Sequence, residues 1–334
     1  MDRTFYSNDR QAICQMSTYM TQDSIALFGS RARGDCDQHS DTDLLLVSDR
    51  LIDREKNVFA NGGLSVSSFT WVQFETMASN GSLFLQHLKQ ESVLLSDASG
   101  RLRSTLRNFQ PELDHRPRIF ENRSLFELTS GTPDHANTLG WAFDVLAVAV
   151  RNHAVLLAAQ DETYLFSHRA LIDWLTQKFR LSSTEAVLLG SLRTLKREYR
   201  GTGKVLSTGW QQLVATQALV ERVFFVSCAS APKSLVEFAQ LRLASTPSVE
   251  AWYLALRSYE GALRSIHPLL TADQAAELHR LEEVISKPSP YSAADFGGLP
   301  GIQDRLSEIL VKLLETNHKM FAQPPLPAIE KSAT

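Results

Sequence analysis

Near the start of the chain, short apolar runs alternate with turn-forming and charged positions. Residues 24–28 are mainly apolar and end at Gly29, and the apolar run 44–47 follows Asp43. Apolar runs of about four to eight residues between such breaks are typical of buried strands. Residues 64–70 follow an Asn-Gly-Gly turn sequence and predict a third strand.

Between and beyond these runs, the spacing of apolar residues becomes helical. Thr70 and Gln73 match a capping box, so a helix is expected to begin there. Residues 82–88 have the pattern of an amphipathic helix, and residues 92–97 that of a short strand or turn. The first hundred residues therefore predict an α/β domain, with a mixed sheet and flanking helices.

Strand patterns are scarce in the rest of the chain. From Phe143 to Leu157, apolar residues recur every three or four positions, as on the core-facing side of a helix. Further helices are expected at 168–180, 183–199, 208–227, 231–244, 248–265, 271–286 and 301–321. The second part of the chain therefore predicts an all-α domain.

Three prolines, Pro111, Pro117 and Pro133, interrupt a charged stretch between the two patterns. We therefore predict an α/β domain at residues 1–100 and a linker at 101–133. A larger all-α domain is expected at 134–322, followed by a flexible tail at 323–334.

The residues around the first two strands carry the chemistry. Gly29 allows a tight turn after the first strand, and Ser30 would begin a helix whose hydroxyl and free N–H groups can meet a phosphate. Arg31 and Arg33 follow at once, and a guanidinium can grip phosphate oxygens through two hydrogen bonds.

Asp41 and Asp43 stand two residues apart at the start of the second strand, so their side chains point the same way. Two neighbouring carboxylates repel each other unless a cation lies between them. Mg²⁺ suits such oxygen ligands, because it typically takes one or two protein carboxylates plus water and substrate phosphates. The pair therefore predicts a site for Mg²⁺ or Mn²⁺.

Gly29-Ser30, ten further residues and then Asp41-x-Asp43 resemble the signature of the DNA polymerase β-like nucleotidyltransferases, most closely their minimal bacterial branch. The resemblance covers about the first hundred residues. It implies that a nucleoside triphosphate, with ATP expected, binds at Gly29, Ser30, Arg31 and Arg33, and that Asp41 and Asp43 hold the metal and carry catalysis. An acceptor hydroxyl would attack the α-phosphorus and release pyrophosphate.

Members of this superfamily usually place a third carboxylate on the next strand, where this chain has Ser65 and Ser67. A hydroxyl cannot take a proton at neutral pH as a carboxylate can. Three explanations stay open. The reaction needs little help from a base, the site binds nucleotide as a regulator without turning it over, or the base is one of Asp53, Glu55, Glu75 and Glu91.

In the helical part, Arg193, Lys196, Arg197 and Arg200 fall at steps of three and four and make one helix face basic. In superfamily members, a helical domain often closes the cleft and contacts the triphosphate or the acceptor. By this resemblance Lys196 and Arg200 are expected to bind nucleotide. The alternative is an ordinary solvated helix face.

The resemblance leaves the acceptor open. An aminoglycoside-type adenylyltransferase would need an acidic cleft for a cationic drug, which Asp35 and Asp37 permit. A protein or RNA (tRNA) acceptor predicts a basic rim, for which residues 193–204 and 116–118 are candidates. We favour a protein or RNA acceptor in a bacterial toxin–antitoxin or defence setting, with a possible protein partner.

Composition adds little to this interpretation. The chain of 334 residues is 43% hydrophobic and 21% charged, as expected of a folded protein, and its net charge is −3. Its three cysteines have no metal-ligand spacing and suit a reducing cytoplasm. The first residues lack the apolar core of a signal peptide, and Asp144, Arg151 and His153 interrupt the apolar stretch 140–159. We therefore expect a cytoplasmic protein that does not span a membrane.

Overall fold

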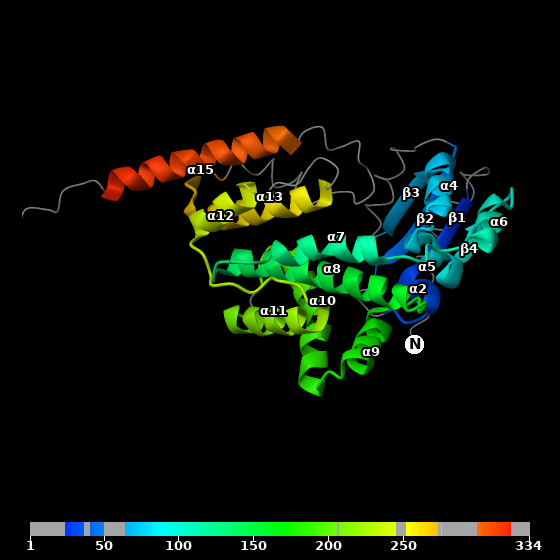
Figure 1. Ribbon diagram of the computed structural model, residues 1–334. Coiled ribbons are helices and arrows are strands. Elements are labelled where there is room, and N and C mark those ends of the chain that lie inside the picture. Colours follow the sequence, from blue (N-terminus) through cyan, green and yellow to red (C-terminus); the bar gives the residue numbers. More distant parts are fainter. Residues whose placement is uncertain are drawn as a thin grey trace, which may run out of the picture. The chain divides into compact units, whose positions relative to one another are not determined.

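The computed structural model describes residues 24–36, 41–49, 64–205, 207–244, 252–272, 275 and 299–321. The chain divides into two compact units. Unit 1 comprises residues 1–119 and 154–178, and unit 2 comprises residues 120–153 and 179–334. The elements are labelled along the chain in Figure 1.

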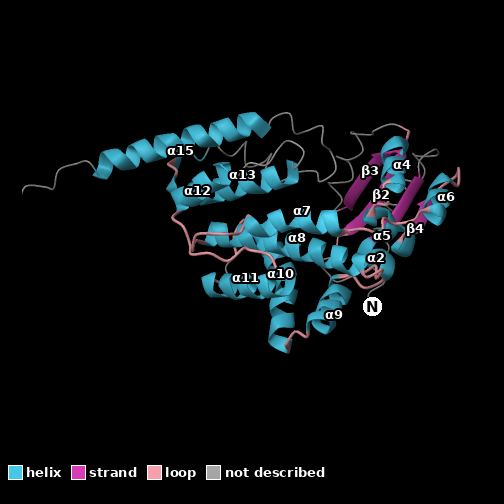
Figure 2. Ribbon diagram, in the orientation of Figure 1, coloured by secondary structure: helices cyan, strands magenta, loops and turns pink. Residues whose placement is uncertain are grey.

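Unit 1 contains a four-stranded sheet of β1 (Ser24–Phe28), β2 (Thr42–Ser48), β3 (Leu64–Thr70) and β4 (Val93–Ser96), in the order β3-β2-β1-β4 (Figure 2). Strand β1 is antiparallel to β2 and β4, whereas β2 and β3 are parallel. The mixed sheet predicted from the sequence is therefore confirmed.

The helices of the sheet region are α2 (Gly29–Arg33), α4 (Trp71–Ser79), α5 (Leu83–Glu91) and α6 (Arg101–Asn108). The predicted capping box is present at the start of α4, where the Thr70 hydroxyl accepts from Gln73 N and the Gln73 side chain accepts from Thr70 N. Residues of α4, α5 and α6 pack against one face of the sheet in a core of Ala26, Phe28, Leu45, Val47, Phe69, Trp71, Phe74, Leu85, Leu88, Leu102, Leu106 and Phe109.

The rest of the described chain is helical, as predicted. The helices are α7 (Arg116–Glu127), α8 (Ala136–Gln160), α9 (His168–Phe179), α10 (Ser183–Thr202), α11 (Trp210–Phe224), α12 (Leu235–Ala244), α13 (Trp252–Ile266), the short 3₁₀ helix η2 (His267–Leu269) and α15 (Leu299–Phe321). The helix predicted at 271–286 falls almost wholly outside the described residues.

The predicted domain boundaries need correction. The linker expected at 101–133 contains α6 and α7. Pro117 does not interrupt α7, because it lies in the first turn, where its missing N–H has no helical partner to lose. Residues 154–178 also belong to unit 1 instead of the helical unit. The predicted tail lies outside the described residues.

Helix α8 is more apolar than the sequence interpretation allowed. By length and composition it could cross a membrane, since its most apolar window has a mean hydropathy of 1.5. However, 72% of that window is buried within the structure, and Trp141, Phe143 and Leu146 are fully covered. Such burial is typical of a core helix.

Candidate nucleotide-binding site

The turn after β1 brings the two halves of the signature together. Gly29 has φ +74°, a conformation that suits glycine, and Phe28 lies opposite Asp43 in the β1–β2 pairing. A Cβ added at Gly29 would lie 2.6 Å from Oδ2 of Asp43. The missing side chain of Gly29 therefore makes room for the Asp43 carboxylate.

The two aspartates lie at the start of β2. Asp41 is exposed just before the strand, and Asp43 is partly buried within it. Among the described residues, no group of three or more His, Cys, Asp or Glu side chains could hold a metal ion. Two carboxylates still suit Mg²⁺, which takes its other ligands from water and phosphate oxygens.

Ser65 and Ser67, where the superfamily resemblance leads us to expect a third acid, both lie on β3. Ser65 pairs directly with Asp43 in the parallel β2–β3 register, and Ser67 pairs with Leu45. Directly paired residues share a face of the sheet, so Ser65 lies on the same face as Asp43. Ser65 is exposed and Ser67 is buried. Ser65 therefore offers a hydroxyl, and not a carboxylate, beside Asp43.

Helix α2 carries Ser30, Arg31 and Arg33, all partly buried. Arg33 donates from Nη1 to Glu91 Oε2 at 2.5 Å, and its Nε lies 3.1 Å from both carboxylate oxygens of Asp35. Burial alone would lower the pKa of Arg33, but hydrogen bonds to the two carboxylates raise this pKa above its usual range. Arg33 therefore stays a cation beside Gly29-Ser30.

The base candidates have other partners where they are described. Glu91 accepts from Arg33 and from His87 Nε2, which lies 2.6 Å away. Burial would raise the pKa of Glu91, but hydrogen bonds from His87 and Arg33 hold this pKa below its usual value. Glu75 pairs with Arg101 at 2.6 Å. Asp53 and Glu55 lie outside the described residues.

One residue of the basic face predicted on α10 already has an ion-pair partner within unit 2. Arg200 donates from Nε to Asp144 at 2.9 Å and also pairs with it through Nη2, while Arg257 reaches the same carboxylate at 2.7 Å. Asp144 is fully buried, and the sequence interpretation saw it as an interruption of an apolar stretch, without seeing these partners. Burial lowers the pKa of Lys196, as do Arg200, Arg151 and Arg257, against the attraction of Asp144.

These hydrogen bonds join Arg200 to Asp144, a residue of its own unit. Arg193, Lys196 and Arg197 on the same helix are partly buried. Nucleotide binding by Lys196 and Arg200 stays a prediction.

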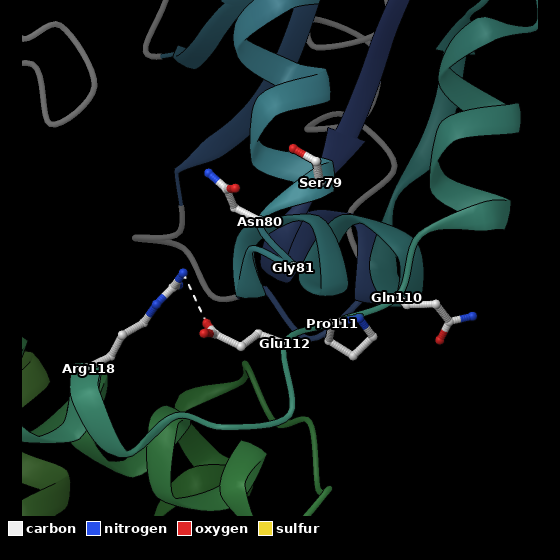
Figure 3. A pocket seen from close by; sticks show the side chains of 7 residues that line it. All are labelled: Ser79, Asn80, Gly81, Gln110, Pro111, Glu112 and Arg118. Carbon is white, nitrogen blue, oxygen red and sulfur yellow. Dashed lines mark ion pairs between the residues drawn. The ribbon is translucent and has the colours of Figure 1, made fainter.

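Unit 1 also has an open pocket of about 540 Å³, drawn in Figure 3. An ion pair of 3.2 Å between Glu112 and Arg118 lies in it. The lining residues are Ser79, Asn80, Gly81, Gln110, Pro111, Glu112 and Arg118, of which only Arg118 was a candidate, for the basic rim of an acceptor site. The pocket is therefore distinct from the signature residues.

Comparison with known protein families supports the signature. Residues 10–78 match the family model described as a nucleotidyltransferase domain, which covers less than a quarter of the 334 residues. This range holds β1, β2 and β3 with both halves of the signature. No curated protein and no solved structure matches the chain. The N-terminal part thus carries a nucleotidyltransferase domain, whose general reaction transfers a nucleoside monophosphate.

Proposed function

We propose that unit 1 is a metal-dependent nucleotidyltransferase that moves the monophosphate of a nucleoside triphosphate, ATP being expected, to an acceptor hydroxyl. The observation that carries this proposal is the approach of the Asp43 carboxylate to Gly29. The approach supports the proposal because transfer at an α-phosphorus requires a phosphate-binding group and a metal ligand close together, the roles we propose for the Gly29-Ser30 turn and Asp43.

Each side chain has a proposed role. Ser30 and Arg33 hold the β- and γ-phosphates, with Arg31 as a helper, and Asp41 and Asp43 hold Mg²⁺ or Mn²⁺. The bound ion supplies positive charge that stabilises the attacking and leaving oxygens. The acceptor oxygen forms its bond to the α-phosphorus while the bond to the bridging oxygen breaks, and pyrophosphate leaves.

Ser65 offers no carboxylate base for the proton of the acceptor hydroxyl, so in this proposal the proton passes to solvent water. Positioning and electrostatic stabilisation supply most of the rate in phosphoryl-type transfer, so the reaction can proceed slowly without one. Ser65 also favours a second candidate, a nucleotide-binding regulator or antitoxin that does not turn nucleotide over.

For the acceptor we favour RNA or protein over an aminoglycoside. Arg103 and Arg107 are exposed one turn apart on α6, and their side chains make no ion pair among the described residues. Such cations favour an anionic macromolecule over a cationic drug. Arg116 and Arg118 are weaker candidates, because they pair with Asp114 and Glu112. A bacterial cytoplasmic toxin–antitoxin or defence setting, with a protein partner, rests on the family resemblance alone.

The test incubates the protein, Mg²⁺ or Mn²⁺ and each α-labelled nucleoside triphosphate with RNA, protein and small-molecule fractions of a bacterial lysate. We expect label in the RNA or protein fraction with the wild type and none with the Asp41→Ala/Asp43→Ala variant. Label in the small-molecule fraction would overturn our choice of acceptor. Metal-dependent nucleotide binding without any transfer would favour the regulator.

A further inference from the structure

Arg33 is the first member of a chain of three polar side chains. Its Nη1 donates to Glu91 Oε2 at 2.5 Å, and His87 Nε2 lies 2.6 Å from the same oxygen. The side chains of Arg33, Glu91 and His87 are 21%, 13% and 12% exposed. These low values limit competition from water at each contact.

His87 is itself held by two aromatic rings. It stacks on Phe166 with ring centroids 4.5 Å apart, and it meets the edge of Phe28 at 5.7 Å. Phe28 is the last residue of β1 and directly precedes Gly29. Phe166 belongs to the 154–178 part of unit 1. The chain of contacts thus joins a late segment of the sequence to the signature turn.

The arrangement bears on how Arg33 meets a phosphate. An arginine side chain loses conformational entropy when it is fixed in one position. Glu91 and Asp35 already fix the guanidinium, so a ligand need not supply that ordering. The contacts occupy Nε and one Nη1 donor, and Nη2 makes no hydrogen bond with the described residues. Nη2 is therefore available to a phosphate oxygen.

We propose that Glu91 and His87 are positioning residues that hold Arg33 for the triphosphate, and that Phe166 fixes His87. This inference rests on the proposed function of Arg33 as a phosphate ligand. It gives Glu91 a role other than that of the missing general base.

The test measures the Kd of Mg²⁺–ATP by calorimetry on the full chain, and KM and kcat once an acceptor is found. We expect Glu91→Gln to weaken binding about tenfold, because a neutral amide oxygen replaces the charged acceptor of the Arg33 hydrogen bond. Its effect is expected in KM, with kcat retained. Asp161→Asn is the matched control, because it also removes a carboxylate from an ion pair in unit 1, with Lys178, and it should leave Kd unchanged.

The double variant Arg33→Ala/Glu91→Gln separates positioning from direct binding. If Glu91 acts through Arg33, the double variant binds no more weakly than Arg33→Ala alone. A further full loss in the double variant would mean that Glu91 acts independently of Arg33, and would overturn the proposal.

If Glu91→Gln fails to fold, two variants of His87 test the proposal. They separate its hydrogen bond to Glu91 from its stacking on Phe166. His87→Gln keeps an N–H donor without the ring, and His87→Phe keeps a ring for Phe166 without the donor. Both are expected to weaken binding by less than Glu91→Gln does.

Three results contradict the proposal. The first is wild-type affinity in Glu91→Gln, and the second is wild-type affinity in both His87 variants. The third is a lower kcat at unchanged KM in Glu91→Gln, together with loss of the acidic limb of its pH–rate profile. The last would mark Glu91 as the base. If wild-type protein binds no nucleotide, the proposed function itself fails, which is a separate outcome.

Discussion

At the scale of single residues, the central feature is the fit between Gly29 and Asp43. Both a left-handed backbone and a close carboxylate require glycine at this position. Gly34 provides a natural comparison, because it has a similar φ of +79° but open space where a Cβ would stand. Substitution of Gly34 therefore tests backbone strain alone, whereas substitution of Gly29 also displaces Asp43.

We predict that Gly29→Ala and Gly34→Ala each lower the free energy of unfolding by about 1 to 2 kcal/mol, the cost of a left-handed non-glycine residue. Metal-dependent nucleotide binding should be lost in Gly29→Ala alone, because its Cβ displaces the carboxylate. Chemical denaturation and calorimetry measure the two effects. Equal loss of binding in both variants would show that strain in the loop, and not Asp43, is responsible.

Ser65 offers a gain-of-function prediction. Because Ser65 pairs with Asp43 and is exposed, Ser65→Asp would place a third carboxylate on the same sheet face. We predict that kcat for label transfer rises about 100-fold, the usual contribution of a general base. Ser65→Asn, of equal size without the charge, should stay at the wild-type rate. An equal rate in all three proteins would show that proton removal does not limit transfer.

The sequence was sufficient to predict the two strands that bring Gly29 next to Asp43, because the residues that form them are close together along the chain. It named Glu91 as a possible base, but the hydrogen bond between Arg33 and Glu91 joins residues 58 positions apart. Such a contact depends on how α5 packs against the sheet, which periodicity alone does not determine.

At the scale of secondary-structure elements, most helices and all three predicted strands were confirmed, because their caps and apolar periods are local signals. Helix α8 shows the limit of that approach. From the sequence, its charged residues indicated a helix too polar for a fully apolar environment. In the structure, Arg200 and Arg257 neutralise the buried Asp144. The compensating residues lie on other helices, so the sequence pattern of α8 could not reveal them.

The Asp144 cluster should dominate the stability of unit 2. Removing its charge with Asp144→Asn leaves two arginines without their buried partner, and we predict a loss of about 3 kcal/mol. Thermal or chemical unfolding measures this value. Glu308→Gln, which alters surface ion pairs with Arg305 and Lys312 on α15, is the control and should leave the unfolding midpoint unchanged. Equal behaviour of the two variants would contradict a structural role for Asp144.

His153 makes the stability of unit 2 depend on pH. Burial, with a smaller effect of Arg123, lowers the pKa of His153 from 6.5 to about 4. Its Nδ1 lies 3.3 Å from Asn122 Nδ2, an arrangement that suits a neutral ring accepting from the amide. The unfolded state binds the proton more tightly, so the stabilisation is complete above pH 6.5 and is lost as pH falls toward 4.

We predict a decrease of at most about 3 kcal/mol in the free energy of unfolding over that pH range. In His153→Gln the decrease should be smaller than in the wild type, and in His267→Gln, which changes an exposed histidine, it should keep its wild-type size. Denaturant unfolding at a series of pH values measures the slope. A wild-type slope in His153→Gln would assign the effect to other groups.

At the scale of the whole molecule, the order of an α/β part followed by a helical part was predicted correctly. The assignment of residues 154–178 to unit 1 was not predicted. Helical periodicity shows which face of a helix is buried, but not which part of the chain covers it. His115 N, for example, donates to Gln160 Oε1 at 2.8 Å, 45 residues along the chain.

This organisation predicts which segments nucleotide binding protects from amide hydrogen exchange. With Mg²⁺–ATP bound, amide hydrogen exchange should slow in residues 25–34, 42–48 and 83–91, and also around Phe166, because its ring stacks on His87. Helices α12 and α13 of unit 2 should exchange as before. Hydrogen-exchange mass spectrometry tests this pattern. Protection confined to residues before 119 would contradict a functional link to the 154–178 segment.

The most direct test of the central claim compares α-labelled with γ-labelled ATP in parallel reactions with the acceptor fraction. A nucleotidyltransferase leaves the α label on the acceptor and releases the γ label in pyrophosphate, and Asp43→Asn should abolish both. A γ label on the acceptor would indicate phosphoryl transfer. Retention of neither label, with nucleotide still bound, would show that the Gly29–Asp43 site binds nucleotide without transferring it.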